Sequence, residues 1–156
     1  FQKNYEIKWL NMMRDKLGLF GEDKNDLKLI NNLLSWMENS KSDYTNTFCY
    51  LMKFNSNNDE IYNDRNFKNW LKDWEKRIMI NGGSIESSTN LMKKSNPIII
   101  PRNHKVEQAL EAVNNNNLEP MNLLLSFLKK PYTSQNGIDK YQEPSNNTKY
   151  QTFCGT

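Results

Sequence analysis

The stretch from residue 67 to residue 80, FKNWLKDWEKRIMI, carries the clearest helical pattern in this chain of 156 residues. Its large apolar residues recur every three or four positions, which places them on one face of a helix, with lysine and glutamate on the other. They are Phe67, Trp70, Leu71, Trp74 and Ile78. An aromatic stripe can form a box for a ligand, but helical spacing favours packing in a core. The stretch therefore predicts an amphipathic core helix.

Three further helices are predicted before this one. The first runs from the start of the chain to a stop at Gly18, and the second covers residues 27–37. The third begins at Tyr44, with Ser42 or Asp43 as its N-cap. The apolar face of the first helix is predicted to hold Ile7, Trp9, Leu10, Met12, Met13 and Leu17.

The helical spacing of apolar residues becomes weaker after residue 80. Residues 85–95 form a weaker helical candidate, and Pro97 and Pro101 then enclose three isoleucines in a segment that must be extended. Asn103 is predicted to cap a helix that reaches Val113, and Met121–Leu128 repeats the same apolar spacing after a turn of four asparagines. These two helices form an antiparallel hairpin.

The expected fold class is therefore all-α, a compact domain of six or seven helices. This helical domain covers residues 1–130, and an extended irregular tail covers residues 131–156. The first residue is Phe and the opening pattern is already helical, so we expect a fragment of a longer protein.

Composition narrows the class of protein. The net charge is +3, from 21 basic and 18 acidic residues, and the basic residues are scattered, which argues against a nucleic-acid partner. No apolar run approaches the ~18 residues that a membrane span needs. Two cysteines without a spacing pattern indicate a reducing compartment, and we expect the cytoplasm. The 25 asparagines are attributed to base composition and receive no functional weight.

Residues for catalysis or metal binding are sparse. His104 is the only histidine, at a predicted helix start, and is interpreted as a partly exposed polar residue. A calcium loop beginning at Asn55 is rejected, because Glu60 replaces the glycine at its sixth position and Asn66 replaces the glutamate at its twelfth. We therefore predict no catalytic, cofactor-binding or metal-binding residue.

One arginine and the two cysteines have more specific expectations. Arg102, between a proline and a helix start, can bridge elements or bind an anion, and a structural ion pair is the favoured interpretation. Cys49 is expected to be buried and inert within the third helix. Cys154 lies near the end of the sequence, where a thiol is accessible to oxidants, and is a candidate for a reversible redox latch.

Several segments together resemble the C-terminal region of the selenoprotein O (YdiU-type) pseudokinases. NPIIIPRNH at 96–104 is followed by VEQALEAV at 106–113 and MNLLLSFLKKPY at 121–132, and a polar tail ends with Cys154. MMRDKLGL, DYTNTF and WLKDWEKR, earlier in the chain, add to the resemblance. The most specific elements are Asn96, Pro97, Arg102, Asn103, Pro131, Tyr132 and Cys154, of which all but Cys154 are interpreted as structural.

The resemblance implies a longer parent protein with a kinase-like fold. Such a protein is implied to transfer AMP from ATP to hydroxyl side chains of other proteins, with Mg or Mn as the divalent metal. The catalytic and nucleotide-binding residues of that family lie in the kinase-like core, and none of its motifs occurs in this chain. Cys154 is implied to form a redox-sensitive link to a cysteine of the core. Two departures are the ending Cys-Gly-Thr and Pro101, where a leucine is more usual.

Two functional hypotheses follow. The first is a helical fragment of a protein adenylyltransferase, inactive alone, whose partners are its own kinase-like core and the substrates of the parent. The alternative is a free-standing helical module for protein–protein interaction. Under the first hypothesis, an apolar face that met the core would be exposed in the isolated chain, which could self-associate through it.

Overall fold

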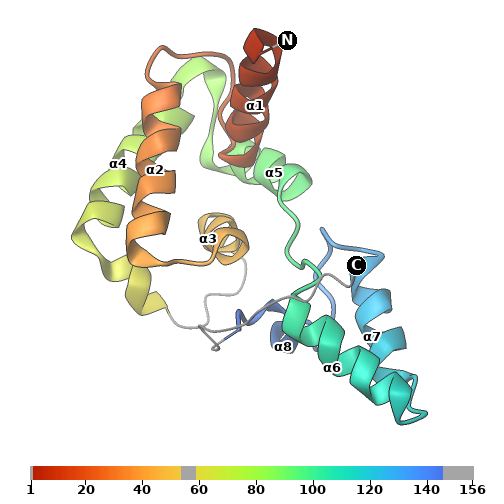
Figure 1. Ribbon diagram of the computed structural model, residues 1–156. Helices are drawn as coiled ribbons and strands as arrows, with labels where there is room; N and C mark the ends of the chain where they lie inside the picture. Colours follow the sequence, from red (N-terminus) through yellow and green to blue (C-terminus); the bar gives the residue numbers. More distant parts are fainter. Residues whose placement is uncertain (1, 54–58, 146–156) are drawn as a thin grey trace. The chain divides into compact units, whose positions relative to one another are not determined.

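The computed structural model describes residues 2–53 and 59–145, with the side chains of Gln2, Lys3 and Asp59 left aside. Eight α-helices and two 3₁₀ helices, but no strands, occur in this part of the chain, which confirms the all-α prediction (Figure 1). The α-helices are α1 (Gln2–Lys16), α2 (Asp26–Ser40), α3 (Tyr44–Leu51), α4 (Arg65–Ile78), α5 (Ile85–Ser95), α6 (Asn103–Asn114), α7 (Glu119–Leu128) and α8 (Asp139–Gln142). The 3₁₀ helices are η1 (Asp59–Asn63) and η2 (Ile80–Gly82). Seven of the α-helices were predicted, and the short α8 was not.

The contacts divide the chain into two compact units, Phe1–Asn96 and Pro97–Thr156. Each is described by itself below. The boundary predicted after residue 130 stays a prediction.

The first unit is organised by the antiparallel pair α2 and α4 (Figure 1). The Trp70 indole N–H donates to the carbonyl oxygen of Leu29 at 2.8 Å, and the Trp74 indole N–H donates to that of Leu17 at 2.8 Å. The rings of Trp36 and Phe67 lie 4.4 Å apart between the two helices. The aromatic stripe of residues 67–78 is therefore a packing surface, as its spacing predicted.

Helix α1 packs against α5, and only its C-terminal half is covered. Met13 and Leu17 are buried, whereas Ile7 is 50% exposed and Met12 is 47% exposed. Ile7 and Met12 were predicted to lie on the apolar face of this helix, and that part of the face is not covered within this unit. The reason is that the first turns of α1 extend beyond the helices that cover its later turns (Figure 1).

The turn after α1 is tight. Gly18 has a φ of 68°, in the left-handed region that glycine tolerates, and a Cβ at this position would lie 2.6 Å from the backbone oxygen of Ser88 in α5. The predicted stop of the first helix at Gly18 is confirmed, and the absence of a side chain there allows α5 to approach closely.

Two predicted helix caps have different outcomes. The Asp43 side chain accepts a hydrogen bond from the backbone N–H of Asn46 at 2.9 Å, so Asp43 is the N-cap of α3. The prediction that Asn103 caps the next long helix is wrong, because Asn103 is the first residue of α6 and Arg102 holds the N-cap position without a capping side-chain hydrogen bond.

The second unit contains the hairpin of α6 and α7, which confirms the predicted pair. Ala109, Leu124 and Phe127 are buried. The segment after Pro131 was predicted as an extended tail, and its described part, 131–145, includes α8 and a buried Ile138. The ring of Tyr141 in α8 lies 5.0 Å from that of Phe127 in α7. Residues 146–156 lie outside the described part of the chain.

Candidate functional site

A buried cluster of charges joins three parts of the first unit. Asp26, the first residue of α2, is 0% exposed. Its Oδ1 accepts a hydrogen bond from Arg77 Nε at 2.6 Å, and its Oδ2 accepts one from Arg14 Nε at 2.7 Å. The backbone N–H of Asp23 also donates to Oδ2 at 3.0 Å. One carboxylate thus connects α1, α2 and α4.

The hydrogen bonds of this cluster decide the charge state of Asp26. Burial acts to raise the pKa of Asp26, but the donors Arg77, Asp23 N–H and Arg14 together outweigh it and hold this pKa below its ordinary value. Arg77 also donates to the carbonyl oxygens of Phe20 and Gly21. Since both carboxylate oxygens accept donors from within the fold, the cluster is an anchor and not a general base.

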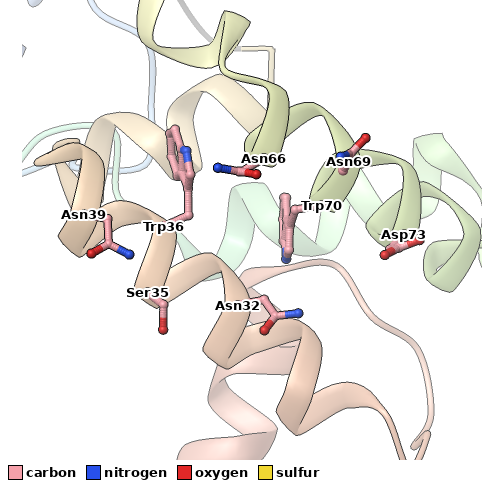
Figure 2. Close-up of a pocket in the computed structure, with 8 residues that line it drawn as sticks. All are labelled: Asn32, Ser35, Trp36, Asn39, Asn66, Asn69, Trp70 and Asp73. Atoms are coloured by element: carbon pink, nitrogen blue, oxygen red, sulfur yellow. The ribbon is translucent and has the colours of Figure 1, made fainter.

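A groove lies over the seam between α2 and α4 (Figure 2). Its volume is about 380 Å³. It is lined by Asn32, Ser35, Trp36 and Asn39 from α2 and by Asn66, Asn69, Trp70 and Asp73 from α4. The two tryptophans are nearly buried, at 7% and 6% exposed, and the six polar side chains are exposed. The groove therefore has an apolar floor and polar walls.

Both indole N–H groups of the floor are already paired. Trp36 donates to Oδ1 of Asp64 at 2.9 Å, while Trp70 donates to the backbone of α2. The pKa of Asp64 is lowered, chiefly because the backbone N–H of Phe67 donates to its carboxylate. The indole N–H groups of the floor are thus not available to a ligand, and the hydrogen-bonding groups of the groove come from its walls.

The segment that was considered and rejected as a calcium loop ends at Asn66, which lines the groove. Asn55 and Asn57 lie outside the described residues, and the part that follows forms η1 and the start of α4. Asp64, two residues before Asn66, is the N-cap of α4 and accepts from the backbone N–H of Phe67 at 2.9 Å. The Asp64 carboxylate therefore caps the N-terminus of α4.

A second hollow of about 310 Å³ continues from the groove. The two share Asn32 and Asp73. The groove was not predicted from the sequence, because the asparagines were given no weight and the tryptophans were treated only as core. The signal that was available is the register of the polar residues relative to the tryptophans on the two helices.

Asn96 was predicted as a structural motif residue, and its contacts fit that role. Its side chain is buried, and Nδ2 donates to the carbonyl oxygens of Lys16 at 2.8 Å and Met92 at 2.9 Å. The amide therefore joins the last turn of α1 to the last turn of α5.

The other motif residues lie in the second unit. The backbone N–H of Ile98, next to Pro97, donates to the carbonyl oxygen of Pro131 at 2.8 Å. Gln142 of α8 donates to the carbonyl oxygen of Ile98 at 2.6 Å. The structure therefore brings the Pro97 and Pro131 segments together through their backbones, whereas the Tyr132 side chain is exposed.

The start of α6 holds Arg102, Asn103 and His104. His104 is half-buried in the first turn, and burial, followed by the charges of Lys105 and Arg102, lowers its pKa. Asn103 is exposed. We assign His104 no catalytic step.

Among the described residues, neither cysteine nor acidic side chains form a metal site. Cys49 is buried in α3, as predicted, and Cys154 lies outside the described residues. Within residues 2–53 and 59–145, no three His, Cys, Asp or Glu side chains gather in a way that could hold a metal ion. The divalent metal implied for the parent protein therefore has no matching ligand set in this part of the chain. None of the helices in the described ranges has the length and apolar character to span a membrane.

Comparison with known proteins defines the class. The protein nucleotidyltransferase YdiU of Pelagibacter ubique is 50% identical over 158 residues, which cover 100% of this chain and 33% of the relative. The proteins of the same name from Nitrosococcus oceani and Alcanivorax borkumensis are each 42% identical over 159 residues, covering 32% and 33% of their own lengths. The chain thus spans about a third of these protein nucleotidyltransferases.

The family follows from a second comparison. Residues 1–129 match the family described as protein adenylyltransferase SelO. The chain belongs to this family, which confirms the resemblance seen in its sequence.

Proposed function

We propose that this chain is the helical C-terminal part of a protein adenylyltransferase that transfers AMP from ATP to Ser, Thr or Tyr hydroxyls of other proteins. The chain supports a kinase-like pseudokinase core, where ATP and Mg or Mn bind, and performs no chemical step itself. The observation that carries this proposal is the family match over residues 1–129, together with relatives three times as long that align with the whole chain.

The exposed apolar residues of α1 support the scaffolding role. Tyr5 and Met12 are seven positions apart, which places them on one face of the helix, and both are exposed. An apolar helix face of this kind is typical of a surface that packs against another part of a protein. We propose that the kinase-like core covers it in the longer protein, and that an isolated chain is prone to self-association through it.

We further propose that Cys154 gates the core by forming a disulfide with a cysteine of that core when an oxidant such as a peroxide takes up the two electrons and two protons of the thiols. The support is the resemblance of the C-terminal segment and the burial of Cys49, since a thiol within α3 is poorly accessible to a second thiol. Peptide mapping of the oxidised longer protein tests this step. A bond from Cys154 to a core cysteine supports it, and a bond only between Cys154 and Cys49 contradicts it.

The proposal that this chain performs no AMP transfer by itself is tested with ATP labelled on its α-phosphate, Mg or Mn, and a generic protein acceptor. The 156-residue chain and the full-length Pelagibacter ubique relative are assayed in parallel. We expect labelled acceptor only with the relative. AMP transfer by the 156-residue chain alone would overturn the proposal.

A further inference from the structure

The eight residues that line the α2–α4 groove consist of two copies of one pattern. On α2 the order is Asn32, Ser35, Trp36, Asn39, and on α4 it is Asn66, Asn69, Trp70, Asp73. Each residue of the second set stands 34 positions after its counterpart in the first. Both helices thus present a tryptophan flanked by small amide, hydroxyl or carboxylate side chains at the same spacing.

The antiparallel arrangement turns this repeat into an approximate two-fold symmetry. Trp36, near the end of α2, donates to Asp64 at the start of α4, and Trp70 donates back to Leu29 near the start of α2. Figure 2 shows the two tryptophans on the floor, with Asn39 toward one end and Asp73 toward the other. The walls of the groove are therefore lined with equivalent side chains from both sides.

The wall side chains have unused hydrogen-bonding capacity. Among the described residues, the side chains of Asn32, Ser35, Asn39, Asn66 and Asn69 make no hydrogen bond to another part of the chain, and Asp73 meets only Lys76, at 3.5 Å. An asparagine amide offers both donors and an acceptor, which matches the one N–H and one C=O of each peptide unit.

We propose that this groove binds the main chain of an extended segment from a separate protein. The asparagines pair with its backbone N–H and C=O groups, and the exposed parts of Trp36 and Trp70 contact its small side chains. The recognition is directed at the backbone and tolerates many sequences.

The dimensions agree with this ligand. From Asn32 to Asn39 the helix advances by about 10 Å, at 1.5 Å per residue. An extended chain rises about 3.3 Å per residue, so the paired walls hold about three residues of a segment. The second hollow, which carries Lys28, Lys76 and Asp23, lengthens the groove at the end that holds Asn32 and Asp73. Its charged side chains distinguish this end and set the direction of the bound segment.

Two other occupants fit less well. A carbohydrate stacks on an exposed aromatic face, but Trp36 and Trp70 are only 7% and 6% exposed. A permanently packed domain buries apolar surface, whereas these walls consist of exposed polar side chains suited to a partner that also exists free in water.

Peptide selection tests the proposal without ATP, so its result is independent of AMP transfer. A phage-displayed library of random ten-residue peptides is selected against the whole chain, and binding of the recovered peptides is measured by fluorescence polarisation. We expect Asn32→Ala and Asn69→Ala each to weaken binding by about fivefold to tenfold, the loss of one or two hydrogen bonds. Asn31→Ala is the matched control, because Asn31 is exposed on α2 but does not line the groove, and it should leave binding unchanged.

Methylation of the peptide backbone distinguishes recognition of the main chain from recognition of side chains. N-methylation of successive peptide amides should abolish binding at two or more central positions where substitution of the side chain by alanine has little effect. Failure to recover any peptide, binding that the groove variants do not change, insensitivity to N-methylation, or binding of an oligosaccharide array in place of peptides would each overturn the proposal. Thermal unfolding of each variant verifies that the fold is intact.

Discussion

Arg77 reaches across 51 residues of sequence to place its Nε 2.6 Å from Oδ1 of Asp26. Arg77 is near the end of α4 and Asp26 begins α2, so this pair fixes the register of the two helices whose seam carries the groove. Because Arg14 of α1 binds the other oxygen of the same carboxylate, a single buried anion also sets the position of the first helix.

Asp26→Asn should destabilise the fold by about 3–5 kcal/mol, since it leaves two buried guanidinium groups without their anion. Asp73→Asn is the matched control, because Asp73 is exposed and its pair with Lys76 spans 3.5 Å at the surface. The control should change the free energy of unfolding by less than about 1 kcal/mol. Urea denaturation measures both, and equal effects would contradict the anchoring role of Asp26.

The same carboxylate makes stability depend on pH. The pKa of Asp26 is lower in the folded chain than in the unfolded one, so its contribution is complete above the unfolded value of about 3.9. It is lost as pH falls through the lower folded value, because the unfolded state then binds more protons. The difference in free energy of unfolding between the unmodified chain and Asp26→Asn should therefore be constant from about pH 5 upward and shrink in stronger acid. A difference that does not vary with pH would show that Asp26 is not charged in the fold.

Gly18→Ala should cost more stability than Gly82→Ala. Both glycines have positive φ, 68° and 76°, so each alanine introduces backbone strain of about 1 kcal/mol. A Cβ at Gly18 would also lie 2.6 Å from the backbone oxygen of Ser88, whereas nothing lies within 4 Å of one at Gly82. We expect a further cost of about 1–3 kcal/mol at Gly18, as α5 is forced away from the end of α1. Thermal unfolding of the two variants measures this difference, and equal midpoints would contradict the close approach.

Asn96→Ala should lower the free energy of unfolding by about 1–3 kcal/mol, because the carbonyl oxygen of Lys16 loses its side-chain donor and that of Met92 keeps only the backbone N–H of residue 96. Asn90→Ala, at an exposed position of α5, should change this free energy by no more than about 0.5 kcal/mol. If the two variants were equally stable, Asn96 would not join α1 to α5, and its place in the family motif would need another explanation.

Apolar spacing was sufficient to predict most of the fold. The stripe from Phe67 to Ile78 and the hairpin of α6 and α7 lie where periodicity placed them, because each helix has to bury a continuous apolar face. Periodicity could not show which part of a face is covered. Ile7 and Met13 were placed on the same apolar face, yet Met13 is 1% exposed and Ile7 is 50% exposed.

The candidate sites were predictable only in part. The pairing of the Pro97 and Pro131 segments depends on backbone groups of Ile98, which carry no sequence signal. The burial of Ile138 and the contact of Gln142 with Ile98 arise from tertiary packing of a segment whose sequence is polar. The groove was missed because its asparagines acquire meaning only when α2 and α4 are placed antiparallel.

We propose that this chain completes a protein adenylyltransferase without supplying its reaction centre. The most direct test replaces the matching third of the Pelagibacter ubique relative, 50% identical, with this chain and measures transfer of labelled AMP to a protein acceptor. We predict that the chimera retains transfer and that the relative without this third is inactive or fails to fold. A truncated relative that folds and transfers AMP at the full-length rate would contradict the account.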